Sequence, residues 1–410
     1  MTVLVIALLL SLPFVQLGYS YYASVSTAAA ALVILLAGRV NLSKLRANFP
    51  LRFFASLLMV ICTASYEGAS GQDVLRAGRE ALAFFLITGC ASWYLPSFDR
   101  RLAKKVLATI WVIVSGTLAL VAIQAIYLRS HQYFGLPVEL YSQNANTVPG
   151  ELQLLYMDVR PSGTFAEPSY LGGICLSLLF AVSPVLQKKR SVQLLTAFIV
   201  AVVLISRSLS GILFTVVYLA YYARKVVRSP RLFYLLLAVL LTASFAVVFT
   251  ENPISARLLR GDGGDLSITS RIFAPLEAIP TILSLHPLGI PAASFQEMGY
   301  AFSHDVTAEE MTHNGLLNLV ISYGFFGFVL IGLTIYSFGK NTNGLVFILA
   351  LSIQNGGFAT VDKFVIIALS MILHNSFRAL SSNSSGSSQR AAQALSMPHI
   401  RRTVGEHRII

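Results

Sequence analysis

The residues best suited to chemistry are a few charged side chains in polar stretches between long apolar runs. They are Arg160, Glu167, Arg207, Arg271 and His313. An arginine guanidinium keeps its charge and binds phosphate oxygens through two parallel hydrogen bonds. A carboxylate or an imidazole can orient or deprotonate a sugar hydroxyl. Because no nucleotide-binding loop accompanies this set, it predicts a lipid-linked phosphate or pyrophosphate substrate.

Arg160 and Glu167 belong to one stretch, which leads directly into an apolar run. Pro168, with Glu167 beside the positive end of the helix dipole, predicts a helix start at this point. One interpretation is therefore a capped helix with no further role. The other places Arg160 and Glu167 at the membrane surface, where they would contact a phosphate and a sugar hydroxyl. The residues alone leave both interpretations open.

Arg207 and His313 stand at the ends of apolar runs. Arg207 lies in the short break 206–211, where an arginine is costly unless it is paired or reaches water. Its alternative role is that of a hairpin-tip side chain extending to the interface. His313 and Asn314 precede a long apolar run, and free N–H groups at a helix start favour an anion. The acids upstream of His313 do not amount to a metal site, so neither a metal nor another cofactor is expected.

The elements that must position these residues are membrane-spanning helices. Of the 410 residues, 55% are hydrophobic and only 12% are charged, which excludes a chain of soluble domains. A spanning helix needs about 20 residues. Candidate spans, about twelve in all, cover 2–19, 22–38, 51–66, 81–97, 106–128, 169–187, 191–206, 209–223, 231–249, 315–339, 342–358 and 361–377. We therefore expect an all-α polytopic integral membrane protein.

The basic residues predict its orientation. With both termini in the cytoplasm, most of the 30 Lys and Arg residues fall in cytoplasmic segments and nearly all 18 acids fall outside. The net charge of +12 is then a topology signal and implies no nucleic-acid partner. Residues 1–380 form the transmembrane domain, with long outer loops at about 129–168 and 250–314. Residues 381–410 are expected to form a disordered cytoplasmic tail.

Four stretches resemble the bacterial O-antigen polymerase and ligase superfamily. They are RPSGTFAEPSYLG (160–172), SRSLSG (206–211), 270–291 with its His-Pro-Leu-Gly, and HNGLLNLVISYGFFG (313–327). The resemblance covers most of residues 100–340 and implies a GT-C-like fold with two long periplasmic loops. It also implies that Arg160, Arg207 and Arg271 bind pyrophosphate, and that His313 or Glu167 acts on the attacking hydroxyl.

The resemblance further implies a metal-independent glycosyltransferase of the bacterial inner membrane, using an undecaprenyl-pyrophosphate-linked oligosaccharide. Membrane lipid and the chain-length regulator and flippase of the same pathway would be its partners. Glu167 departs from the usual ligase pattern, which favours a Wzy-type polysaccharide polymerase over an O-antigen ligase acting on lipid A core. Outside this class, a lipid-linked oligosaccharide transporter or a structural component of a synthesis complex stays open.

We expect His313→Ala to lower polymer formation by roughly 100- to 10,000-fold, because general acid–base catalysis contributes about that factor. The measurement is the ladder of lipid-linked products at matched protein level. A normal ladder from this variant would remove His313 from the mechanism.

Overall fold

The computed structural model describes residues 2–15, 29–32, 34, 42–90, 99–135, 159–165, 167–186, 190–226, 274–291, 314–339, 341–354 and 357–396. Within these ranges every regular element is a helix. The elements are α1 (Thr2–Ser11), η1 (Leu12–Phe14), α3 (Leu42–Ala64), α4 (Gly71–Cys90), α5 (Arg100–Arg129), α7 (Pro168–Val182), η3 (Ser183–Val185), α8 (Arg190–Ile205), α9 (Leu209–Val226), α13 (Ala274–Leu285), α14 (Leu317–Tyr323), α15 (Phe325–Phe338), α16 (Thr342–Gln354) and α17 (Val361–Ser396).

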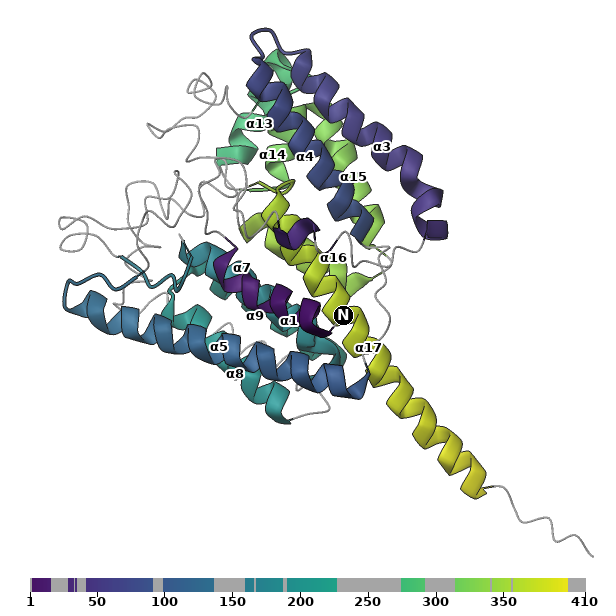
Figure 1. The fold of residues 1–410 in the computed structure, drawn as a ribbon. Coiled ribbons are helices and arrows are strands. Elements are labelled where there is room, and N and C mark those ends of the chain that lie inside the picture. The colour runs from purple at the N-terminus through teal and green to yellow at the C-terminus, as the bar shows by residue number, and fades with distance from the viewer. Residues whose placement is uncertain are drawn as a thin grey trace, which may run out of the picture.

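These helices form two groups joined by a shared pair (Figure 1). One group contains α3, α4, α13, α14 and α15, and the other contains α1, α5, α7, α8 and α9. Helix α17 packs against both α7 and α4, and α16 contacts α7, α9 and α15. The last two helices in the chain thereby connect the two groups.

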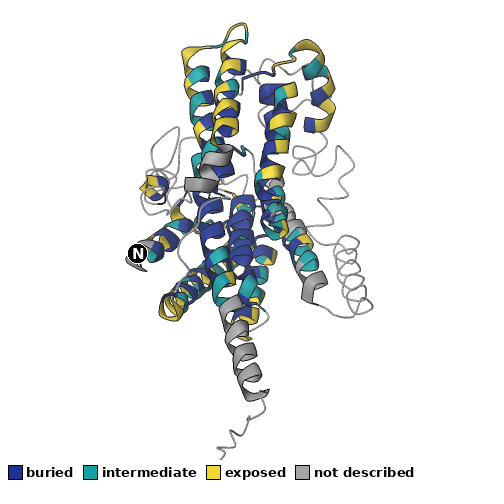
Figure 2. Cartoon of the chain, turned by 90° about the vertical axis from the view of Figure 1, so that its right-hand side faces the viewer, coloured by how far each residue is buried: buried dark blue, intermediate teal, exposed yellow. Residues whose placement is uncertain are grey.

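Burial separates central helices from peripheral ones (Figure 2). Every residue of α7 after Pro168 is buried, as is the stretch 363–374 of α17. Peripheral helices instead expose large apolar side chains, among them Phe54 of α3, Val112 of α5 and Phe325 of α15. Exposed apolar faces of this extent suit a lipid surrounding rather than water. The helices therefore belong to a membrane protein.

Three described helices are long and apolar enough to cross a membrane: α5, α7 together with η3, and α17 up to Ser381. They confirm the expected spans at 106–128, 169–187 and 361–377 as helices. Several other runs form shorter apolar helices, and the run at 231–249 lies outside the described residues. The count of twelve and the GT-C-like arrangement stay predictions. Helix α17 continues to Ser396, beyond the expected domain boundary at 380, and the disordered tail also stays a prediction.

The sequence-based expectation of one continuous helix over 315–339 is wrong. The chain forms α14 and α15, separated at Gly324, which has φ 58° and ψ −138°. The turn at 286–291 packs into this break: Phe325 N donates to Pro287 O (3.0 Å) and Ile290 N donates to Ile321 O (3.0 Å). Two glycines allow the contact, because a Cβ on Gly289 or on Gly324 would overlap backbone atoms of the facing segment.

We expect Gly324→Ala to lower the free energy of unfolding by about 1–3 kcal/mol, since its backbone conformation is one that only glycine adopts readily. The added Cβ would also lie 1.9 Å from Pro287 O. The measurement is the thermal unfolding midpoint in detergent. Gly332→Ala in α15 is the matched control, because a Cβ there meets nothing within 4 Å. Equal midpoints for the two variants would contradict this account of the break.

Candidate functional site

Several sequence-predicted residues gather at one end of the helices, which we call the motif end. It comprises the ends of α1, α5 and α8 and the starts of α7, α9 and α17. Thr164 Oγ1 donates to Pro13 O just after α1, and the Tyr170 hydroxyl donates to the Asp362 carboxylate at the start of α17. The segment 159–165 runs across this end, and Glu167 directly precedes α7.

Gln124 of α5 holds this segment in place. Its Nε2 donates to Gly163 O (2.9 Å), and its Oε1 accepts from Gly163 N (2.8 Å) and Ser162 N (3.2 Å). The side chain is only 2% exposed, so these bonds lie in a poorly hydrated interior. Hydrogen bonds there are costly to break, because each buried group left without a partner loses about 1–3 kcal/mol. One amide thus satisfies the backbone of a loop that crosses the bundle end.

The local sequence suits this tight course. Gly163 has φ +68°, a conformation that favours glycine, and Phe165 N closes a turn onto Ser162 O (3.2 Å). The Phe165 ring is buried and stacks on Tyr170 at 5.8 Å between centroids. The stretch after Arg160 is therefore a fixed structure between α5 and α7.

Arg207 contacts the same segment from the α8–α9 junction. The break expected at 206–211 is confirmed, since α8 ends at Ile205 and α9 begins at Leu209. Arg207 has φ +48°, which is uncommon for a residue with a side chain, and its Nη2 donates to Val159 O (3.0 Å). Its guanidinium thus bonds to the residue next to Arg160. Both arginines are half-buried.

Glu167 confirms the expected helix start and has an additional contact. It is the N-cap residue of α7, with Pro168 in the first turn. Its side chain makes no bond to the helix backbone and instead accepts from Ser169 Oγ at 2.8 Å. The Glu167 side chain is exposed, so its carboxylate is accessible to a substrate hydroxyl.

Sequence reasoning missed the contact between α7 and α17. Besides the bond between Tyr170 and Asp362, Lys363 Nζ lies 5.2 Å from the Tyr170 ring centroid, in a cation–π contact. Lys363 is buried, although it stands at the start of an apolar run. The available signal was the Asp-Lys pair in front of the last expected span. The sequence feature that could have identified Gln124 is similar: its amide is a polar group within an otherwise apolar run.

Arg271 and His313 lie outside the described residues, so their roles stay predictions. The expectation of free N–H groups beside His313 is wrong for the residues that follow it. Asn314 Oδ1 accepts from Leu316 N and Leu317 N (both 3.0 Å) and Gly315 N donates to Ser352 O (2.8 Å). The backbone N–H groups of Gly315, Leu316 and Leu317 are therefore not free to bind an anion.

The arrangement offers two half-buried arginines and one exposed carboxylate along a rigid segment. Permanent cations in a partly desolvated place stabilise developing phosphate charge more strongly than cations in water. Among the described residues no group of three or more His, Cys, Asp or Glu is placed to hold a metal ion. The arrangement can therefore bind an anionic leaving group and contact a hydroxyl nearby.

Comparison with protein families gives a match over most of the chain. The model described as WcaD colanic acid polymerase matches residues 1–376, which is nearly the whole chain. No curated protein matches the chain.

We expect Gln124→Leu to abolish polymer formation while leaving most of the protein folded, because it frees three backbone groups of the 162–163 turn. Hydrogen–deuterium exchange at 159–165 should rise at least about tenfold, as expected if opening becomes easier by about 1.4 kcal/mol. Gln132→Leu, at an exposed position just after α5, is the control. Unchanged exchange in Gln124→Leu would show that the clamp does not hold the segment.

Proposed function

Because the chain belongs to the WcaD colanic acid polymerase family, we propose that it joins polyprenyl-pyrophosphate-linked repeat units into a polysaccharide. The family supports a glycosyltransferase-type enzyme of exopolysaccharide synthesis whose substrate is a lipid-linked oligosaccharide. The finer proposal is that undecaprenyl pyrophosphate carries the donor glycan and that the acceptor is the incoming lipid-linked repeat unit.

The contact between Arg207 and Val159 is the observation that best supports this function. It joins the α8–α9 junction to the segment that carries Arg160. Two half-buried arginines beside one rigid backbone segment suit a pyrophosphate, whose oxygens accept from planar guanidinium donors. Arg271 is proposed as a third cation of the same site on the family resemblance.

The proposed reaction is a direct displacement. The acceptor hydroxyl attacks the anomeric carbon of the donor glycan, a new C–O bond forms, and the bond to the pyrophosphate oxygen breaks. The hydroxyl proton passes to His313 or Glu167, and the arginines neutralise the departing undecaprenyl pyrophosphate. Inversion at the anomeric carbon follows from a single displacement, so a retained configuration from a defined donor would contradict it.

The proposed location is the outer face of the bacterial cytoplasmic membrane, with both termini in the cytoplasm. Most Lys and Arg residues then fall on the cytoplasmic side. The motif end faces the periplasm in this orientation, where the donor's own pyrophosphate linkage supplies the activation. We propose that the arginines take the place of a metal ion, and that the ladder therefore forms in excess EDTA.

Reconstitution tests the proposed function. The purified protein in liposomes receives a defined undecaprenyl-pyrophosphate oligosaccharide and no other substrate. A ladder of longer lipid-linked products supports the polymerase. Reaction only after lipid A core is added would indicate a ligase instead, and movement across the bilayer without new bonds would indicate a transporter.

In this assay we expect Arg207→Lys to fail nearly as fully as Arg207→Ala, losing at least about 100-fold in rate. A lysine ammonium is a point charge and cannot reproduce the planar donor fork. Arg129→Lys, at an exposed position at the end of α5, is the matched control and should keep the full ladder. A full-length ladder from Arg207→Lys would show that only the charge matters at this position.

A further inference from the structure

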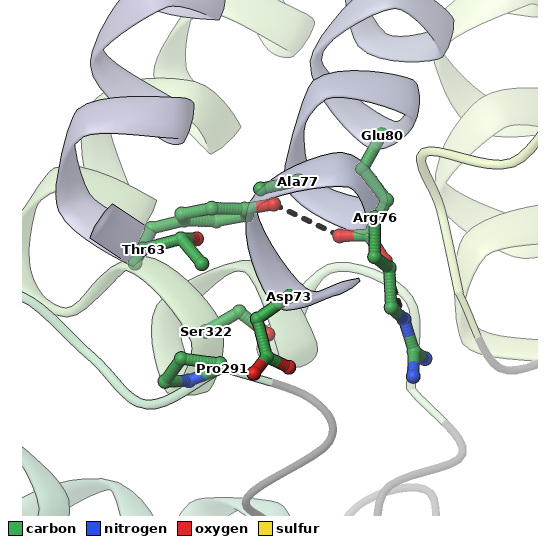
Figure 3. A pocket seen from close by; sticks show the side chains of 8 residues that line it. Thr63, Asp73, Arg76, Ala77, Glu80, Pro291 and Ser322 are labelled. Atoms are coloured by element: carbon green, nitrogen blue, oxygen red, sulfur yellow. Dashed lines mark hydrogen bonds and ion pairs between the residues drawn. The ribbon is translucent and has the colours of Figure 1, made fainter. Parts of the chain in front are cut away.

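A polar pocket lies where the α3–α4 hairpin meets α14, at a different place from the segment that carries Arg160 (Figure 3). It is lined by Thr63, Asp73, Arg76, Ala77, Glu80, Pro291, Ser322 and Tyr323. The hairpin turn is attached to the 286–291 turn through a ring contact between Tyr66 and His286, 5.6 Å between centroids. The pocket therefore lies between two segments that are separate in sequence but fixed against each other.

Asp73 places an unused acceptor in this pocket. One carboxylate oxygen, Oδ2, accepts from Ser70 N (2.9 Å) and Ser70 Oγ (2.7 Å), while Asp73 N donates back to Ser70 Oγ (3.2 Å). This reciprocal pattern is a capping box that starts α4. The other oxygen, Oδ1, is buried and accepts no hydrogen bond from the residues that the structure describes, although Asp73 is only 6% exposed. Capping of α4 therefore uses only Oδ2 of the Asp73 carboxylate.

The opposite wall of the pocket is a fixed polar network. Tyr323 Oη donates to Glu80 Oε2 (2.8 Å), and Arg76 Nε donates to Glu80 Oε1 (3.2 Å). In Figure 3 the Asp73 carboxylate lies beside Pro291, and Glu80 lies beside Arg76. The Arg76 side chain is 44% exposed, so the pocket opens toward solvent on the arginine side.

The charges of the lining select the ligand chemistry. Two carboxylates against one arginine repel an anion, which separates this pocket from the proposed pyrophosphate site. A metal ion is not indicated, because no group of three ligating side chains occurs in the described part of the chain. Asp73 Oδ1 needs a donor, and Arg76 is a donor. A neutral group that both donates and accepts, such as a sugar hydroxyl, matches this pair.

We propose that this pocket binds a hydroxyl-bearing edge of the acceptor sugar during chain extension. The assignment rests on the proposed function, because a polymerase must hold an acceptor glycan beside its donor. Ser322 and Tyr323 end the short helix α14, and His313 comes shortly before that helix in the sequence. With seven residues, α14 is about 10 Å long. A bound acceptor would therefore lie within a short oligosaccharide's length of the segment after His313.

The pocket's size restricts what enters it. Its enclosed volume is about 10 Å³, which is room for about one water-sized group. It therefore takes one hydroxyl at the edge of a sugar ring and leaves the ring and the rest of the glycan outside. Such a contact selects an acceptor by the position of its hydroxyls.

Asp73→Asn tests the proposal, because an amide oxygen keeps the bonds to Ser70 while an NH₂ group replaces the unused acceptor. The probe is the free oligosaccharide released by mild acid from the lipid-linked repeat unit, titrated onto the full-length protein in nanodiscs. Binding is read by saturation-transfer NMR. We expect Asp73→Asn to weaken it at least about tenfold, the factor of one hydrogen bond to a charged group, at an unchanged unfolding midpoint.

Ser70→Ala is the matched control, since it removes the capping hydroxyl and leaves Asp73 Oδ1 in place. It should lower the unfolding midpoint and leave sugar binding intact. Ala77→Leu, which fills the pocket without changing its charges, should weaken binding even if Asp73→Asn fails to fold. Wild-type binding in both Asp73→Asn and Ala77→Leu would overturn the proposal, as would binding that requires a divalent cation.

The experiments distinguish a failure of the polymerase proposal from a failure of the sugar-site proposal. Arg207→Lys should bind the free oligosaccharide as wild type does, because this probe carries no pyrophosphate. If the wild-type protein binds the sugar through Asp73 but forms no ladder, the sugar site stands and the polymerase assignment falls. If it forms a ladder but both Asp73→Asn and Ala77→Leu leave sugar binding unchanged, the sugar site alone is contradicted.

Discussion

The amide of Gln124 is the interaction on which the candidate site depends. It satisfies three backbone groups of the 162–163 turn from within an apolar helix, in a place where water cannot substitute for it. The turn in turn fixes Phe165 against Tyr170, and Tyr170 connects α7 to α17. At the motif end, α5, α7 and α17 are therefore held relative to one another by side chains that take no part in the proposed reaction.

The second fixed point is the break at Gly324. Without it, 315–339 would be one straight helix, and the 286–291 turn would have no place to pack. With it, Ser322 and Tyr323 come against the α3–α4 hairpin and complete a polar wall with Glu80. The two helix groups thus carry different polar sites, one with Arg160 and Arg207 and the other with Asp73 and Glu80. A transferase that holds an anionic donor and a neutral acceptor needs both kinds.

Peripheral and central helices obey different constraints. Helix α7 is buried on all sides, so its small residues matter for close packing, as where Gly211 of α9 approaches Gly172. Helix α5 has apolar residues on every side because its outward face meets lipid and its inward face meets protein. Hydropathy identifies both helices equally well, and it cannot tell which of them is central.

The sequence by itself determined the membrane class, the helical segments at 106–128, 169–187 and 361–377, the break around Arg207 and the helix start at Pro168, since composition and local signals are sufficient for these. Only the tertiary structure decided that Arg207 bonds to Val159, that Gln124 holds the turn, that Asn314 occupies the N–H groups after His313, and that Asp73 faces Tyr323 across a pocket. Each of these pairs lies far apart in sequence or depends on a side-chain direction. Hydrophobic periodicity carries no information about either, because it reports which residues avoid water and not which of them meet.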